Sequence, residues 1–263
     1  MTLTTAHWLD YTTRRQHHSV VGTLKILPGL SSPQLNNHRD VLVCLPDSYY
    51  THEFTARRYP VVYMHDAQNL FDRATSFVGV EWQVDETMQA LGREGLEAIV
   101  VGLNHTRADR LLEYNPFADP PKCGIKYLDF LTETVKPLID RDFRTIPDPG
   151  HTGIMGSSMG GLISLYAIFH RPDVFGFAGV MSPSLWVCNF AIYPYIRHAP
   201  PAPGKIYLDH GTREGSAEPM RDVLIEKGLR LNDRLIYVRE EGGEHTEAAW
   251  ARRLPNALRF LLR

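Results

Sequence analysis

The sequence predicts an α/β fold with a mostly parallel central sheet and helices on both faces. Short β-rich runs alternate with amphipathic helical patterns along most of the 263 residues. Two of these runs, residues 61–64 and 98–103, are apolar throughout, which is typical of strands buried on both faces. Strands that alternate with helices usually pair in parallel through right-handed crossovers, so the pattern predicts a sheet of this kind.

The first two strands are expected at residues 19–27 and 38–45, paired in antiparallel fashion. The loop between them contains Pro28-Gly29 and Asn36-Asn37, which are residues typical of turns. The later strands are expected at residues 61–64, 98–103, 151–157, 175–181, 205–209 and 234–238. The helices are expected at residues 81–91, 127–139, 159–169, 219–230 and 246–262.

Two segments fall outside this alternation. Residues 104–123 are polar and proline-containing, so we expect irregular structure there. Residues 182–203 form an aromatic-rich insertion that ends in a proline-rich stretch. Since no Gly/Ser-rich or charged linker divides the chain, we expect residues 1–263 to form a single domain.

The composition is that of an ordinary globular protein. A net charge of −2 gives no reason to expect nucleic acid or an anionic membrane as a partner, and no apolar stretch approaches membrane-spanning length. Cys44, Cys123 and Cys188 are widely spaced, so they suit free thiols in a reducing compartment. Residues 1–10 lack the basic region and apolar run of a signal peptide, so we expect a cytoplasmic protein.

The motif with the clearest chemistry is Gly156-Ser157-Ser158-Met159-Gly160, a G-x-S-x-G between a predicted strand and a predicted helix. This arrangement is the nucleophile elbow of an α/β-hydrolase. The serine occupies a tight turn that holds its hydroxyl clear of the backbone. Glycines two residues before and after it allow the turn to close without a side-chain clash. The motif therefore predicts Ser158 as a nucleophile.

A serine hydroxyl needs a base to remove its proton, and in this fold the order along the chain is serine, acid, histidine. His245 follows the last predicted strand in a glycine-containing loop, so it is the candidate base. Glu214 lies in the loop after the strand at 205–209 and is our choice for the acid, and Asp209, nearer the strand end, is the alternative; either could orient the histidine. A Ser–His pair without an acid is a third, minor alternative.

The oxyanion that develops in acyl transfer needs two N–H donors. One is expected to be the backbone N–H of Met159, directly after the nucleophile. The other is expected from the loop that follows the strand at 61–64, where we assign it to Gln68, with Ala67 as the alternative. No dinucleotide, P-loop or zinc-binding motif is present, so the sequence predicts neither a cofactor nor a metal.

Taken together, these segments resemble the esterase D / putative esterase family of α/β-hydrolases. That family includes feruloyl esterases, S-formylglutathione hydrolase, enterochelin-type esterases and mycolyltransferases. The likeness runs from about residue 20 to the end of the chain. It is carried by four segments, which are residues 62–72, residues 151–162 with the elbow, residues 209–214, and residues 243–245 with Trp250.

The resemblance implies roles for individual residues. Ser158, Glu214 and His245 would form the triad, because the Gly-Thr-x-Glu pattern of the family favours Glu214 over Asp209, and the backbones of Gln68 and Met159 would form the oxyanion hole. The family has aromatic residues that are expected to bind substrate at Trp82, Tyr114 and Trp186. The chain departs from the family at Ala67, where glycine is usual, and a positive φ there would strain the alanine.

We therefore expect a serine esterase that hydrolyses a carboxylic ester, or a thioester, through an acyl-enzyme. Acyl transfer to an alcohol would use the same residues, and an inactive binding protein on this fold is the alternative of another class. The expected partner is a small-molecule ester. The sequence does not determine the natural ester or the oligomeric state.

Overall fold

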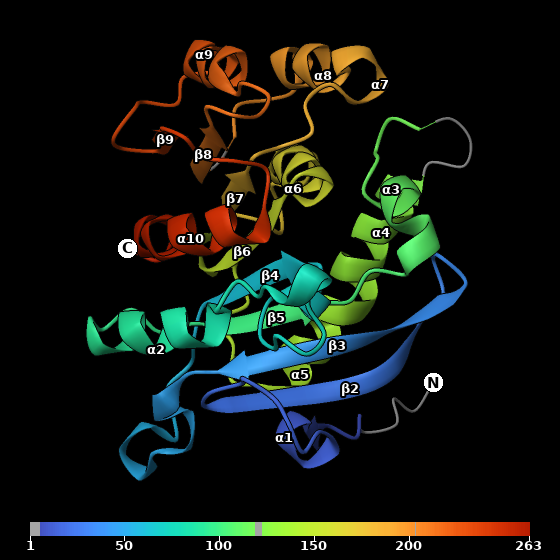
Figure 1. The fold of residues 1–263 in the computed structure, drawn as a ribbon, viewed down its shortest axis with the longest axis vertical. Helices are drawn as coiled ribbons and strands as arrows, with labels where there is room; N and C mark the ends of the chain where they lie inside the picture. Colours follow the sequence, from blue (N-terminus) through green and yellow to red (C-terminus); the bar gives the residue numbers. More distant parts are fainter. Residues whose placement is uncertain (1–5, 119–122, 203) are drawn as a thin grey trace.

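The computed structural model describes residues 6–118, 123–202 and 204–263. Within them, nine strands form one sheet in the order β1-β2-β3-β5-β4-β6-β7-β8-β9 (Figure 1). The strands from β5 to β9 are parallel, whereas β1, β2 and β3 are antiparallel to their neighbours. The strand bounds are β1 (Leu9–Asp10), β2 (Thr23–Ser32), β3 (Asn37–Leu45), β4 (Val61–His65), β5 (Ile99–Leu103), β6 (Thr152–Ser157), β7 (Phe177–Met181), β8 (Lys205–Gly211) and β9 (Leu235–Glu240).

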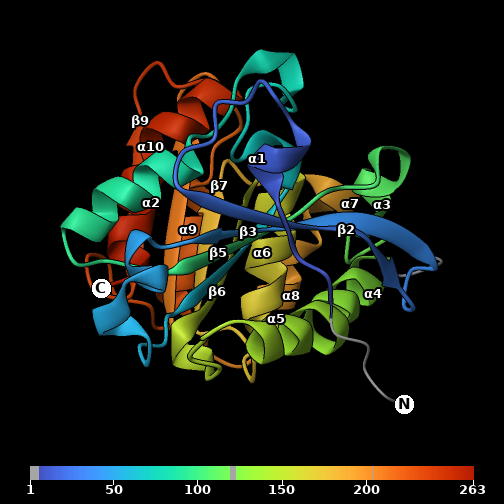
Figure 2. The same cartoon turned by 90° about the horizontal axis from the view of Figure 1, so that it is seen from below.

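Helices cover both faces of this sheet, as the sequence predicts. α2 and α10 pack against each other and lie on one face, whereas α5, α6 and α8 lie on the other (Figure 2). The helix bounds are α1 (Tyr11–Arg14), α2 (Val84–Arg93), α3 (Arg110–Glu113), α4 (Cys123–Asp129), α5 (Lys136–Asp142), α6 (Met159–His170), α7 (Val187–Phe190), α8 (Ile192–His198), α9 (Glu218–Glu226) and α10 (Glu247–Leu261).

Alternation along the strands divides the core into two apolar clusters, one on each face. In β3, the side chains of Val41 and Val43 join the cluster beneath α5 and α6. Those of Leu42 and Cys44 join the cluster beneath α2 and α10. Successive side chains of a strand point to opposite faces, so one apolar run supplies both cores.

The prediction that the first strand ends before Pro28-Gly29 is wrong. β2 continues to Ser32, and its register with β3 shifts between Leu27 and Leu30. A bulge of this kind accommodates a proline, which has no N–H for the ladder, and a glycine at positive φ. Gly29 has φ 62°, and its N–H donates to Asp40 Oδ1 at 2.8 Å.

The two segments that fall outside the alternation of strands and helices, the one expected to be irregular and the aromatic-rich insertion, contain short helices. Residues 104–118 include a 3-10 turn (Arg107–Asp109) and α3, and residues 182–202 include α7 and α8. The helix expected at 127–139 is part of a longer helical run, in which a π-helical segment (Phe130–Val135) joins α4 to α5. Pro120, Pro121 and residue 203 lie outside the described residues.

The parallel strands place their carboxyl ends along one edge of the sheet. The loops after β4, β6, β7, β8 and β9 therefore meet at this edge, where open α/β sheets bind their ligands. Among the described residues, no helix combines the length and the apolar character that crossing a membrane requires.

Candidate active site

Ser158 lies at the sharp turn between β6 and α6. Its backbone has φ 58° and ψ −121°, a conformation that costs a non-glycine residue about 1–3 kcal/mol. Three backbone hydrogen bonds hold the turn. Ser158 N–H donates to Met181 O at 3.0 Å, and Ser158 O accepts from Leu162 N–H at 3.0 Å and Ser184 N–H at 2.9 Å. The surrounding structure therefore fixes the strained backbone of this serine.

The glycines of the motif allow β6 and α6 to approach closely. A Cβ at Gly156 would lie 2.8 Å from His65 Cδ2 and 2.9 Å from the carbonyl carbon of Gly160. A Cβ at Gly160 would lie 3.3 Å from His65 Cβ. Any side chain at Gly156 would thus push the strand end away from the helix that follows the serine.

His245 and Glu214 are hydrogen-bonded to each other. His245 lies between β9 and α10, and its Nδ1 donates to Glu214 Oε2 at 2.6 Å. The other carboxylate oxygen of Glu214 accepts from Ser182 Oγ at 2.7 Å and from Gly211 N–H at 2.5 Å. Burial favours the neutral acid, but these hydrogen bonds outweigh it and lower the pKa of Glu214. Glu214 is therefore ionised at neutral pH.

Asp209 has a different environment. It is fully buried at the end of β8, 3.0 Å from Arg253 Nη1, and it accepts from Ser182 N–H at 3.0 Å. Burial raises the pKa of Asp209 to about 7, and Arg253 opposes this rise. The structure thus brings Glu214 to His245 and directs Asp209 into the core.

Several residues around this pair have no assigned role in the sequence-based prediction. Ser182 Oγ accepts from Trp250 Nε1 at 2.9 Å and from Arg253 Nη2 at 3.0 Å while it donates to Glu214. Ser184 Oγ lies 3.2 Å from Ser158 Oγ. Both serines follow β7, so their position at the carboxyl end of a parallel strand is the signal that could have found them.

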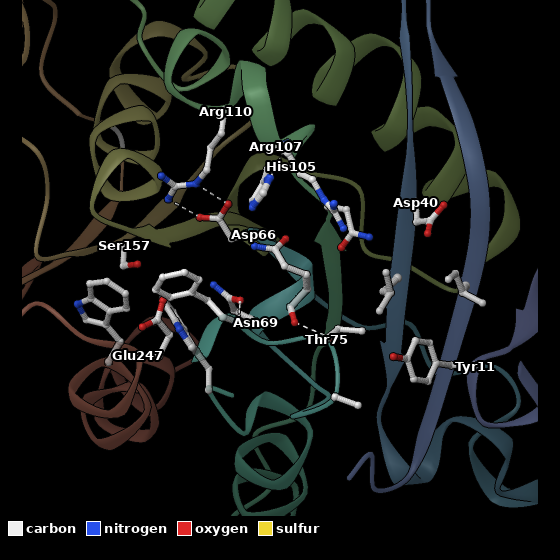
Figure 3. Close-up of a pocket in the computed structure, with 18 of the residues that line it drawn as sticks. Tyr11, Asp40, Asp66, Asn69, Thr75, His105, Arg107, Arg110, Ser157 and Glu247 are labelled. Carbon is white, nitrogen blue, oxygen red and sulfur yellow. Dashed lines mark hydrogen bonds and ion pairs between the residues drawn. The ribbon is translucent and has the colours of Figure 1, made fainter. Parts of the chain in front are cut away.

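A cavity of about 1010 Å³ opens at the carboxyl edge of the sheet (Figure 3). Ser158, His245 and Trp250 line it together with Trp82, so the predicted nucleophile and base share one cavity. The rings of His245 and Trp250 meet edge to face, with centroids 5.0 Å apart.

The three aromatic residues expected to bind substrate lie in three different environments. Trp82 lines the cavity and is 3% exposed. Tyr114 is fully buried behind the wall, where its hydroxyl contacts Asp66. Trp186 is 67% exposed and is not among the described residues that line the cavity. Only Trp82 of the three is thus placed against the cavity space.

The loop after β4 lines the cavity together with Ser158. Asp66 has φ 58°, and Ala67 to Asn69 form a 3-10 turn, so the positive φ falls on Asp66 and the strain considered for Ala67 does not arise. Ala67 is 1% exposed and packs against Gly102 of β5, where a Cβ would lie 2.8 Å from the Ala67 Cβ. Ala67 therefore does not narrow the cavity, whereas Gln68 lines it.

The positions of the two predicted oxyanion donors follow from helix geometry. Met159 is the first residue of α6, and Gln68 lies in the 3-10 helix of one turn at Ala67–Asn69, so both residues lie in first turns. First-turn N–H groups have no acceptor within their own helix and are available to a ligand.

Asp66 is held by two partners. Its carboxylate accepts from Arg110 Nε at 2.8 Å and Nη2 at 2.7 Å, and its Oδ1 accepts from Tyr114 Oη at 3.3 Å. Burial favours the neutral acid, but Arg110 lowers the pKa of Asp66 below its usual value. The contact with Arg110 therefore fixes Asp66, which immediately precedes the 3-10 turn that contains Gln68.

His65, at the end of β4, is a structural residue. It is 2% exposed, and its Nδ1 and Nε2 lie 2.7 Å from Tyr127 Oη and 3.1 Å from Ser164 Oγ. Burial lowers the pKa of His65 to about 4, so the ring is neutral. No group of three or more His, Cys, Asp or Glu side chains in the described ranges has the geometry to hold a metal ion.

The sheet order, the strained serine after β6 and the acid and histidine after β8 and β9 define an α/β-hydrolase. The family model described as "Putative esterase" matches residues 32–261. The chain therefore belongs to this esterase family, and membership supports the hydrolysis of esters as its activity.

Two relatives from Bacillus subtilis (strain 168) illustrate how far the sequence likeness extends. The uncharacterized protein YbbA is 29% identical over 254 residues, which cover 88% of this chain and 95% of YbbA. The ferri-bacillibactin esterase BesA is 27% identical over 146 residues, which cover 48% of each chain. The likeness to the relative with a stated activity thus spans about half of its length.

Solved structures share the fold at lower sequence identity. A ferulic acid esterase has a TM-score of 0.72 at 22% identity, covering 91% of this chain and 98% of that one. The BES protein from Bacillus cereus has a TM-score of 0.69 at 20% identity, covering 95% and 98%. The enterobactin esterase FES from Shigella flexneri, in the presence of enterobactin, has a TM-score of 0.71 at 20% identity, covering 92% and 60%.

Proposed function

We propose that the protein is a serine carboxylic-ester hydrolase that acts through an acyl-enzyme. The observation that carries this proposal is the cavity that Ser158 shares with His245, whose Nδ1 is bonded to the ionised Glu214 at 2.6 Å. A strained nucleophile, a base and an orienting acid are the three groups that acyl transfer needs.

In the proposed reaction, Ser158 Oγ attacks the ester carbonyl while His245 Nε2 takes its proton. His245 then returns that proton to the leaving alkoxide, and the ester bond breaks to give the acyl-serine. A water molecule, deprotonated by the same nitrogen, attacks the acyl-serine, and the bond between the acyl carbon and Ser158 Oγ breaks to release the acid as His245 returns the proton to Ser158 Oγ. Glu214 holds the tautomer with the proton on Nδ1, and it stabilises the imidazolium.

The backbone N–H groups of Met159 and Gln68 are proposed to stabilise the tetrahedral oxyanion. Loss of one such donor typically costs about 10²–10³ in kcat. Gln68 lies in the cavity wall, and Asp66 immediately before its turn is fixed by Arg110, so the loop needs little reorganisation when the substrate binds.

The names of the relatives suggest which esters to try first. The ferulic acid esterase indicates aryl esters, and BesA indicates siderophore esters. A cavity of about 1010 Å³ is large enough for either class. We further propose one catalytic domain in a reducing, cytoplasmic setting. The family match over residues 32–261 supports the single domain, and the free thiols of Cys44, Cys123 and Cys188 support the reducing setting.

The direct test is hydrolysis of p-nitrophenyl esters of varied acyl length by the wild type, Ser158→Ala and Ser157→Ala. Ser158→Ala should lower kcat by at least about 10³, whereas Ser157→Ala should retain it within about tenfold. A fluorophosphonate should label the wild type at Ser158, as intact mass and peptide mapping would show. Wild-type turnover by Ser158→Ala would refute the assignment. Product analysis with added alcohol would separate hydrolysis from acyl transfer.

A further inference from the structure

The cavity extends far beyond the elbow, and its two ends differ in chemistry. Ser157 and Glu247 lie at one end, and Tyr11 and Asp40 lie at the other, with Arg107 between them (Figure 3). The far end is built from the N-terminal segment and from β2 and β3. A volume of about 1010 Å³ is at the upper limit of pockets for drug-sized ligands, so a simple short ester would leave this end unused.

Three arginines line this cavity without an acidic partner. In the described part of the chain, the side chains of Arg14, Arg15 and Arg107 have neither an ion pair within 4.0 Å nor a hydrogen bond. Arg110 differs, because Asp66 already binds its guanidinium bidentately. A free guanidinium in a cavity wall is suited to bind an oxyanion through paired N–H groups.

The backbone at Arg107 is held in an unusual conformation. Its φ is 55°, which costs a non-glycine residue about 1–3 kcal/mol, and its N–H donates to His105 Nδ1 at 2.8 Å. His105 and Arg107 both line the cavity. The turn therefore places the guanidinium at the cavity wall at a cost in backbone strain.

The segment that carries Arg14 and Arg15 is anchored to Asp72. Tyr11 Oη donates to Asp72 Oδ2 at 2.7 Å, and Ser19 N–H donates to Asp72 Oδ1 at 3.3 Å. Asp72 is 1% exposed and ends the loop that begins at Asp66. These bonds hold both ends of the segment, and Arg14 and Arg15 between them line the cavity.

The acidic residues that line the cavity do not pair with these three arginines. Asp66 is paired with Arg110, Asp40 accepts from the N–H of Gly29, and Glu247 lies at the opposite end of the cavity (Figure 3). Three arginines therefore stand against one lining carboxylate, Asp40, in this part of the wall, which leaves an excess of positive charge for a ligand.

We propose that Arg14, Arg15 and Arg107 form a subsite for a carboxylate on the substrate, at a distance from the ester that is cleaved. The substrate class would then be bulky esters with an anionic group remote from the reacting carbonyl. The assignment of this class rests on the proposed esterase function, because Ser158 at the near end defines which bond is cleaved.

The test uses p-nitrophenyl half-esters of dicarboxylic acids, from glutaric to sebacic acid, each beside its neutral methyl ester. The wild type should prefer the anionic member of the best pair by about tenfold or more in kcat/KM, and 0.5 M NaCl should weaken this preference. Arg107→Gln and Arg14→Gln/Arg15→Gln should each lower the preference several-fold while turnover of the neutral ester stays within about twofold.

Arg230→Gln is the matched control, because Arg230 is exposed and lies outside the cavity. It removes the same charge and should keep the full preference. An unchanged preference in both cavity variants, or an equal loss in the control, would overturn the subsite.

A second readout separates this proposal from the esterase function. Binding of the suberate dianion can be followed through the fluorescence of Trp82 and Trp250, which line the cavity. If the wild type cleaves no ester but binds suberate, and Arg107→Gln weakens binding at least fivefold, the subsite stands and the proposed reaction fails. If hydrolysis depends on Ser158 but suberate does not bind and anionic esters have no advantage, the subsite fails alone.

Discussion

The near and far ends of the cavity are built on different physical principles. At the near end, both carboxylate oxygens of Glu214 are hydrogen-bonded, and the elbow is fixed by backbone hydrogen bonds and by the close approach at Gly156. At the far end and between the two ends, the side chains of Arg14 and Arg107 have no ion pair or hydrogen bond among the described residues and are exposed. The candidate catalytic groups are therefore held in place by hydrogen bonds within the protein. The arginines proposed to bind substrate instead have side chains that are free to bind a ligand.

The largest expected effect separates the two carboxylates of the near end. Glu214→Gln should lower kcat by about 10²-fold or more, because the amide cannot stabilise the imidazolium of His245. Asp209→Asn should lower kcat less than about tenfold, since Asp209 does not contact the histidine. Steady-state kinetics of both isosteric variants on one p-nitrophenyl ester measures the difference. Equal losses of kcat in the two variants would contradict the assignment of Glu214, and not Asp209, as the acid that orients His245.

A smaller effect on kcat is expected at Arg110, which connects the near end of the cavity to its far end. Arg110 comes from the wall of residues 104–118 but fixes Asp66, next to the turn with Gln68. Arg110→Met should lower kcat about tenfold with KM changed less than about threefold, because oxyanion stabilisation acts in the transition state. Arg110→Lys should restore part of kcat. A loss confined to KM would instead make Arg110 a substrate-binding residue.

The last prediction concerns stability and its dependence on pH. Asp209 keeps its proton up to about pH 7 in the folded protein but loses it near pH 3.8 in the unfolded chain. Between pH 3.8 and about pH 7 the folded state therefore binds more protons than the unfolded state. The contribution of Asp209 to stability falls as the pH rises through this range. Between pH 5 and pH 8 the loss should be roughly 2.5 kcal/mol.

Denaturant unfolding at both pH values, followed by circular dichroism, measures this effect. Asp209→Asn cannot titrate, so it should lose about that much of the wild-type pH dependence. The exposed Asp233 provides the control, because Asp233→Asn should leave the pH dependence unchanged. If the wild type and Asp209→Asn both gained the same stability between pH 5 and pH 8, the assignment to Asp209 would be contradicted.

Local patterns were sufficient to predict the fold. Continuous apolar runs at β4 and β5 predict buried parallel strands because both faces of such strands need apolar side chains. Gly156 and Gly160 around Ser158 predict the elbow, because the turn needs glycine where strand and helix approach. Local signals were misleading at Pro28-Gly29, which form a bulge inside β2 and not its end.

The sequence by itself determined the order of the catalytic candidates, Ser158 before Glu214 or Asp209 before His245. The family resemblance already favoured Glu214 over Asp209, but only the tertiary structure shows why Asp209 is held away from the histidine, since Arg253 and Ser182 arrive from α10 and the end of β7. It also placed Arg14 and Arg15 beside the cavity and Trp186 away from it. The physical reason is that burial and pairing depend on segments distant in the chain, which local patterns do not record.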